Sequence, residues 1–215
     1  MNVVTTTINK NTTKPVVAIV AALLPKYGIG YKGKLPWKLK KEMEYFKTVT
    51  TYTKDPSKVN AVIMGRKTWE SIPKRFKPLP NRLNVIISRQ YNRTLAEENI
   101  KEKNIVKYND LQQSIIDLQN RVDIERIYII GGGEIYNQTY GICSHLLITE
   151  ITNTNNSMNL EMDTFLDRDK IDSSFIKETN ETKWFEFIHQ HKDFNKATGY
   201  NDNDYSFDFT LYYHK

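Results

Sequence analysis

Residues 35–46 read LPWKLKKEMEYF and predict an amphipathic helix that begins just after Pro36 and Trp37. No proline or glycine follows for many residues, so nothing in the sequence ends this helix early. On a wheel of about 3.6 residues per turn, one face collects residues that are almost all apolar: Leu39, Glu42, Met43, Phe46 and Val49. The opposite face is charged and comprises Lys40, Lys41, Glu44 and Lys47.

Glu42 is the exception on the apolar face, whereas the neighbouring Glu44 points to solvent. Burial of a lone carboxylate is costly, and it raises the pKa of the group toward the range that acid chemistry uses. Two interpretations stay open: a structural role, in which Glu42 pairs with a buried cation or extends to the edge of the apolar face, or a carboxyl group kept for function. Glu42 is therefore the first candidate catalytic residue.

The composition indicates a globular protein of the cytoplasm. Of 215 residues, 39% are apolar and 12% aromatic, which suffices for one well-buried core, and no run reaches the length of a membrane span. The single cysteine, Cys143, excludes an internal disulfide and fits a reducing compartment. Residues 1–14 resemble neither a signal peptide nor a transit peptide, so we expect a disordered tail there and a single domain over residues 15–215.

The charge is unevenly distributed along the chain. Residues 1–107 hold 22 basic and 7 acidic residues, a net charge of +15, whereas the remainder holds 9 basic and 18 acidic residues, a net charge of −9. Such asymmetry indicates that a polyanion approaches the first half. Nucleic acid and a small phosphorylated ligand both satisfy this pattern, and composition alone does not choose between them.

Short apolar runs alternate with helical patterns, which predicts an α/β fold with a mostly parallel sheet covered by helices. The expected strands are residues 16–24, 61–64, 83–87, 105–108, 127–130 and 146–151, with an amphipathic helix over 111–118. Near the C-terminus, residues 184–189 and 205–213 alternate in polarity and predict an antiparallel hairpin joined by the polar segment 191–204.

Three of these strands end in turns that suit an anion. Gly65-Arg66-Lys67-Thr68 follows the second strand, Ser88-Arg89 follows the third, and three glycines precede Glu134 and Ile135. Glycines let a backbone approach phosphate, and ligands of open α/β sheets bind beyond the carboxyl ends of the strands. Residues 28–33 (GIGYKG) match the dinucleotide motif only formally, because the third glycine does not open a helix, and we expect a mobile loop over a site instead.

Other chemistries are poorly supported. The histidines His145, His189, His191 and His214 lack the spacing of metal ligands, Cys143 has no paired histidine, and Ser88 lacks a nucleophile elbow. The prolines of residues 77–82 (KPLPNR) stiffen a loop that presents Arg82 for bidentate contact with a carboxylate.

These segments, in this order, resemble the dihydrofolate reductase family, and its fungal branch in particular. The resemblance rests on IVAAL at 19–23, GIGYKGKLPW at 28–37, Glu42 with Phe46, MGRKTWESIP at 64–73, LPNR at 79–82, ISR at 87–89, IIGGGEIY at 129–136, LLITEI at 146–151 and MDTF at 162–165. It implies a central, mostly parallel sheet of about eight strands flanked by helices and ending in an antiparallel strand. It also implies reduction of 7,8-dihydrofolate to tetrahydrofolate with NADPH.

The resemblance further implies roles for individual residues. Glu42 would bind the pterin amidine edge and support protonation at N5, Trp37 would hold a structural water, and Thr149 would steady Glu42. Arg82 would bind the α-carboxylate of the glutamate tail. The folate cleft would be lined by Ile19, Val20, Ala21, Leu35, Phe46, Ile72, Ile130 and Tyr136.

For the cofactor, the resemblance implies that NADPH is held by Ala21, Ile29, Gly65, Arg66, Lys67, Thr68, Ser88, Arg89, Gly131, Gly132, Gly133, Glu134 and Ile135. Arg66, Ser88 and Arg89 would meet the adenosine 2′-phosphate, and the Gly131–Gly132 peptide would be cis. No metal is expected, antifolates would bind in the substrate cleft, and we expect a monomer that binds neither membrane nor nucleic acid.

Two alternatives compete with this interpretation. A pyrimidine reductase of riboflavin synthesis shares the general fold and NADPH use, but Trp37, Glu42, Phe46 and Arg82 fit a pterin with a glutamate tail. A basic RNA-binding module fits the charge of the first half, but the cations surround glycine turns rather than forming one continuous face.

Overall fold

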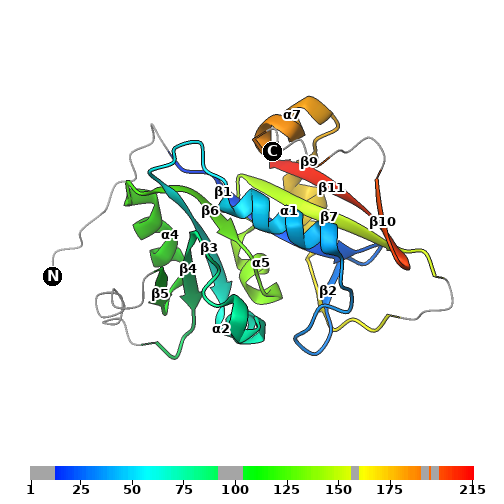
Figure 1. Ribbon diagram of the computed structural model, residues 1–215, viewed down its shortest axis with the longest axis horizontal. Helices are drawn as coiled ribbons and strands as arrows, with labels where there is room; N and C mark the ends of the chain where they lie inside the picture. The colour runs from blue at the N-terminus through cyan, green and yellow to red at the C-terminus, as the bar shows by residue number, and fades with distance from the viewer. Residues whose placement is uncertain (1–12, 92–103, 156–159, 190–193, 195–198) are drawn as a thin grey trace.

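A computed structural model describes residues 13–91, 104–155, 160–189, 194 and 199–215 (Figure 1). Most of the expected N-terminal tail and parts of the three polar loops at 92–104, 153–159 and 191–204 lie outside these residues. Lys14, at the end of the expected tail, has its backbone N–H 2.8 Å from the Gln119 side-chain oxygen. No helix within the described part of the chain is long and apolar enough to cross a membrane.

One sheet of eleven strands organises the described residues. Its main path runs through β10 (Tyr200–Asp202), β11 (Tyr205–His214), β7 (His145–Asn153), β1 (Val16–Leu23), β6 (Ile124–Ile129), β3 (Val59–Gly65), β4 (Arg82–Ile87) and β5 (Ile105–Tyr108). Three short strands attach to this path: β2 (Gly28–Gly30), β8 (Thr164–Phe165) and β9 (Phe175–Lys177).

The neighbours from β7 through β1, β6, β3 and β4 to β5 are all parallel, whereas β11 is antiparallel to β7. The central strands are largely apolar, with the buried polar residues Asn60, Arg82 and Asn84 as exceptions in β3 and β4, because both faces of the sheet are covered. The predicted α/β class, the eight-strand path and the antiparallel C-terminal strand are confirmed.

Helices lie on both faces of the sheet: α1 (Lys40–Thr51), α2 (Arg66–Ser71), the 3₁₀ turn η1 (Lys74–Phe76), α4 (Leu111–Asn120), α5 (Gly133–Thr139), α6 (Arg168–Ser174) and α7 (Glu181–Phe187). Successive residues of β1 belong to two different apolar clusters. Ala18 lies in the cluster that contains residues of α4 and α5, and Ile19 lies in the cluster that contains residues of α1 and α7. Figure 1 shows α1 lying across the middle of the sheet. The face under α1 is called the α1 face below, and the other the α5 face.

The buried side of α1 differs from the predicted one in two residues. Met43 is 52% exposed, whereas Tyr45 is 1% exposed and its ring stacks on Phe209 with centroids 3.8 Å apart. Glu42 and Val49 are buried as predicted, and Phe46 is half-buried. The inward face is therefore rotated toward β11, because aromatic side chains of that strand give Tyr45 a partner that the helical wheel cannot reveal.

The predicted hairpin between residues 184–189 and 205–213 is wrong. Trp184 lies in α7, whose first turn is capped by the Asn180 side chain accepting a hydrogen bond from the Thr182 backbone N–H at 2.9 Å. This cap, followed by Glu181, starts a helix and outweighs a short alternation of aromatic residues. The antiparallel partners of β11 are instead β7, β9 and β10.

Candidate active site

The carboxyl ends of the parallel strands bring two glycine turns into contact. The Gly65 backbone N–H, at the end of β3, donates to the Gly131 carbonyl beyond β6 at 2.8 Å. A Cβ on Gly132 would lie 3.2 Å from the Thr68 hydroxyl, and one on Gly65 would lie 3.3 Å from Ile135. The Gly131–Gly132 peptide is cis, as the resemblance implies. These turns leave room for backbone but little for side chains.

Glu42 is 6% exposed on the buried side of α1. Burial raises the pKa of its carboxyl group to about 7, and no other cause contributes to this shift. Within the described residues, neither a hydrogen bond nor an ion pair engages this carboxylate. A structural ion pair, which the sequence left open, is not supported, because no cation pairs with Glu42 in the described part of the chain.

Trp37 and Thr149 are both buried on the face of the sheet that carries Glu42. The indole N–H of Trp37 is buried and has no hydrogen-bond partner among the described residues. Thr149, on β7, is 2% exposed and pairs in register with Ala21 of β1 and Phe209 of β11. No direct hydrogen bond joins either side chain to Glu42 in the described structure, so the unpaired indole N–H fits a bridging water.

Arg82, the first residue of β4, is a buried cation at the other end of the helix. It is 3% exposed, and its guanidinium donates to the Thr50 hydroxyl at 2.8 Å and to the Pro80 carbonyl at 3.1 Å. Burial lowers the pKa of Arg82 to about 10. The described residues include no carboxylate paired with it, so its remaining donors suit an external anion.

Around these charged groups lie most of the predicted substrate residues. Ile19 and Ala21 of β1 belong to the α1 face, together with the partly buried Phe46, Ile72 and Ile130. Leu35 is 52% exposed. Val20 packs against the cluster of the α5 face, so the structure does not bring its side chain to Glu42.

Tyr136 connects α5 to β1, the strand that carries Ile19 and Ala21. Its hydroxyl donates to the Ile19 carbonyl at 2.8 Å, and its ring lies 3.1 Å from where a Cβ on Gly131 would be. The charge of Glu42 contributes to raising the pKa of Tyr136, after burial and the nearby Tyr140. Tyr136 therefore stays a neutral donor that ties the glycine turn to β1.

The predicted phosphate residues lie at the same strand ends. Arg66 begins α2 and its guanidinium is 2.6 Å from Glu70, while Lys67 is exposed and Thr68 half-buried beside Gly132. Ser88 and Arg89 follow β4 directly, with Arg89 exposed. The remaining predicted cofactor residues, Gly133, Glu134 and Ile135, form the first turn of α5.

The loop over the site is anchored by a residue that the sequence analysis left without a role. Asp163 accepts a hydrogen bond from the Lys32 backbone N–H at 2.7 Å and donates its own N–H to the Gly30 carbonyl at 3.1 Å. This backbone hydrogen bond from Lys32 is the main reason that the pKa of Asp163 is lowered. Asp163 belongs to the motif MDTF at 162–165, which the sequence analysis noted. Its contacts with Gly30 and Lys32 are visible only in the structure.

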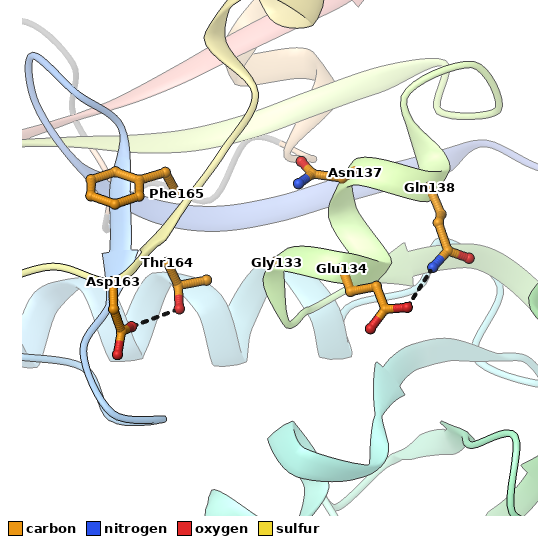
Figure 2. Close-up of a pocket in the computed structure, with 7 residues that line it drawn as sticks. All are labelled: Gly133, Glu134, Asn137, Gln138, Asp163, Thr164 and Phe165. Carbon is orange, nitrogen blue, oxygen red and sulfur yellow. Dashed lines mark hydrogen bonds between the residues drawn. The ribbon is translucent and has the colours of Figure 1, made fainter.

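A cavity of about 530 Å³ lies between this anchor and α5 (Figure 2). It is lined by Gly133, Glu134, Asn137, Gln138, Asp163, Thr164 and Phe165. Ile29, in β2, is buried, and a Cβ on Gly133 would lie 2.7 Å from Thr164. The cavity thus borders the start of α5 from the side of the loop.

Comparisons with known proteins agree with this geometry. A family model described as "Dihydrofolate reductase" matches residues 16–212. A dihydrofolate reductase of Saccharomyces cerevisiae is 46% identical over 208 residues, covering 94% of this chain and 97% of that protein. One of Candida albicans is 55% identical over 157 residues, covering 71% and 77%. A bifunctional dihydrofolate reductase-thymidylate synthase of Daucus carota is 41% identical over 153 residues, covering 69% and 27%.

Proposed function

The chain belongs to the dihydrofolate reductase family, and we propose that Glu42 is the residue that handles the proton in its reaction. The enzyme reduces 7,8-dihydrofolate to 5,6,7,8-tetrahydrofolate with NADPH. When bound, NADPH supplies the hydride that passes from nicotinamide C4 to pterin C6, and N5 of the pterin takes up a proton. The protein residues must therefore orient two ligands, exclude water and hold a proton.

Glu42 accepts hydrogen bonds from the amidine edge of the pterin, where the 2-amino group and N3–H are donors. A carboxyl group with a pKa of about 7 exchanges a proton readily at neutral pH, which suits protonation at N5. Trp37 holds a water beside this path through its indole N–H, which has no partner in the described part of the chain, and Thr149 steadies Glu42 through water.

Arg82 receives the α-carboxylate of the glutamate tail. Its guanidinium is already fixed by Thr50 and Pro80, so little conformational freedom is lost when the carboxylate binds. The substrate then lies between Glu42 and Arg82, against Ile19, Ala21, Leu35, Phe46, Ile72, Ile130 and Tyr136. Competitive antifolates occupy the same cleft.

The glycine turns hold NADPH. Gly131, Gly132 and Gly133 with Glu134 and Ile135 leave backbone free to approach the pyrophosphate, and the close contacts at Gly65 and Gly132 support this assignment. Lys67 and Thr68 add donors, Ala21 and Ile29 flank the nicotinamide, and Arg66, Ser88 and Arg89 bind the adenosine 2′-phosphate. The choice of NADPH over NADH follows from these last three residues.

We further propose a cytoplasmic monomer with one catalytic domain over residues 15–215. Size-exclusion chromatography with light scattering at micromolar concentration tests the oligomeric state. A stable dimer would contradict this part of the proposal.

The observation that carries the proposal is the buried carboxyl group of Glu42, which has no partner among the described residues. Dihydrofolate-dependent loss of NADPH absorbance measures turnover, and we expect Glu42→Gln to keep most folate binding while losing most turnover at neutral pH. Glu44→Gln, on the exposed side of the same helix, is the matched control and retains activity. Wild-type turnover in Glu42→Gln would refute the role given to Glu42.

A further inference from the structure

A chain of polar side chains lies on the α5 face of the sheet, away from Glu42. The hydroxyls of Tyr27 and Tyr212 are 3.5 Å apart, and the Tyr212 hydroxyl is 2.5 Å from the Glu150 carboxylate. The other oxygen of Glu150 is 2.6 Å from the Lys177 ammonium. Tyr27 and Tyr212 are 8% and 6% exposed, so the contact between their hydroxyls is largely shielded from water, whereas the Lys177 side chain is 44% exposed.

The direction of these hydrogen bonds follows from their chemistry. The Glu150 carboxylate, paired with Lys177, can only accept, so the Tyr212 hydroxyl donates to it. The lone pairs of the Tyr212 oxygen are then left for the Tyr27 hydroxyl, which donates in turn. Each bond polarises the next, and the charged end at Glu150 makes the bond to Tyr212 the stronger one.

The chain connects three neighbouring strands to the turn after β1. Tyr212 lies in β11, Glu150 in β7 and Lys177 in β9, strands that lie side by side in the sheet (Figure 1). Tyr212 and Lys177 are direct partners in the register of β11 and β9. Rigid elements thus hold the Tyr212 hydroxyl at a fixed place beneath Tyr27.

Tyr27 is the last residue of the turn between β1 and β2, where the loop over the site begins. Its φ is +55°, a left-handed conformation that is costly for a bulky side chain and persists only where the surroundings hold it. Its carbonyl accepts a hydrogen bond from the Leu166 N–H at 3.0 Å, and the Arg168 guanidinium lies over its ring at 6.0 Å. Gly28 and β2 follow immediately.

We propose that Tyr212, held by Glu150 and Lys177 at hydrogen-bond distance from the strained Tyr27, is a positioning residue for the loop over the active site. The loop contains Ile29 and continues to Leu35 and Trp37, so its path from Tyr27 decides how it covers the nicotinamide and pterin. The inference rests on the proposed function of that cleft. Tyr212 lies on the α5 face, opposite Glu42, so it acts only through Tyr27.

The test compares Tyr212→Phe with Tyr213→Phe in the full chain. Tyr213 is the next residue of β11, so its side chain points to the opposite face and serves as the matched control. Stopped-flow release of NADPH, KM for NADPH and the melting temperature are measured for each. We expect Tyr212→Phe to release NADPH roughly two- to threefold faster than wild type, the change that corresponds to the lower end of the range for one net hydrogen bond, as suits an oxygen–oxygen distance of 3.5 Å.

Glu150 supplies a second pair of variants in case Tyr212→Phe does not fold. Glu150→Gln keeps an oxygen that accepts from Tyr212, whereas Glu150→Ala removes it, so the latter should speed NADPH release more. If Tyr212→Phe had a lower melting temperature but released NADPH at the wild-type rate, the network would have only a structural role, and the inference would be overturned. Absence of NADPH turnover in the wild type would instead refute the proposed function, which keeps the two failures distinct.

Discussion

In the ligand-free protein, the unfolding free energy of Glu42→Gln should rise relative to that of wild type as the pH increases from acidic to alkaline. The folded-state pKa of Glu42 is about 7, against an ordinary value of 4.5. Below the lower value both folded and unfolded chains are protonated, and Glu42 contributes nothing to pH dependence. As the pH rises, the unfolded chain loses its proton first, so stability falls through this range and the full loss is present above the folded-state pKa.

The size of the effect follows from the difference between the two pKa values. At about 1.36 kcal/mol per pH unit, wild type should lose roughly 3 kcal/mol of unfolding free energy between acidic and mildly alkaline pH because of Glu42 alone. No discount for solvent screening is needed, because Glu42 is 6% exposed. The glutamine variant does not titrate at this position and lacks this loss.

Urea denaturation of both proteins at a series of pH values measures the effect. Every other titrating group is common to both, so the difference between the two unfolding free energies isolates Glu42. Glu44→Gln is the control, and its difference from wild type should change by less than about 0.5 kcal/mol over the same range because Glu44 is exposed. A difference between Glu42→Gln and wild type that is constant with pH would refute burial as the cause of a raised pKa at Glu42.

Three further variants test other parts of the molecule. Arg82→Ala should weaken dihydrofolate binding roughly 10- to 100-fold, the value of a charge-assisted hydrogen bond, as measured by titration. Binding of a pterin that lacks the glutamate tail should weaken much less. Equal losses for both ligands would contradict the assignment of Arg82. The double variant Arg66→Ala and Arg89→Ala should raise KM for NADPH while leaving KM for NADH nearly unchanged, and parallel changes in steady-state kinetics would count against a 2′-phosphate site. Tyr45→Ala should lower the unfolding free energy by roughly 3–5 kcal/mol in urea melts, since it leaves a cavity beside Phe209; a loss below about 1 kcal/mol would exclude a central packing role.

Much of the fold was predictable because the central strands are apolar on both faces. Runs such as residues 61–64 and 83–87 have no polar alternation, so they indicate buried parallel strands without further information. The order of the strands in the sheet was not derivable from such runs, and the resemblance implied only the number of strands and an antiparallel strand at the C-terminus; the structure supplies the order. The strand ends were also set by neighbours: β6 starts at Ile124, three residues before the predicted strand, where it meets Val59 of β3.

Where sequence reasoning failed, a tertiary partner decided the outcome. Met43 and Tyr45 are both compatible with the inner side of a helix, and only the aromatic residues of β11 select Tyr45. Trp184 fits a strand pattern until the cap at Asn180 is recognised. Asp163 could not be assigned from its motif, because its partner Lys32 lies far away in the sequence.

The charge asymmetry of the chain and the raised pKa of Glu42 look contradictory, since a basic environment lowers the pKa of a carboxyl group. Residues 1–107 carry a net charge of +15, yet burial alone determines the shift at Glu42. Distance resolves the conflict, because Arg82 binds Thr50, which lies roughly 12 Å along the helix from Glu42. Lys67 and Arg89 are exposed, and water and salt screen exposed charges beyond about 8 Å.

This separation has a chemical consequence. A cation in contact with Glu42 would stabilise the carboxylate and lower its pKa, so that no proton would be available at neutral pH. In the proposed function, cations placed at the strand ends and at Arg82 bind the anionic ends of the two ligands without altering the group between them. The first half of the chain would then supply the charges that hold the ligands, while apolar residues of both halves bury Glu42 and raise its pKa.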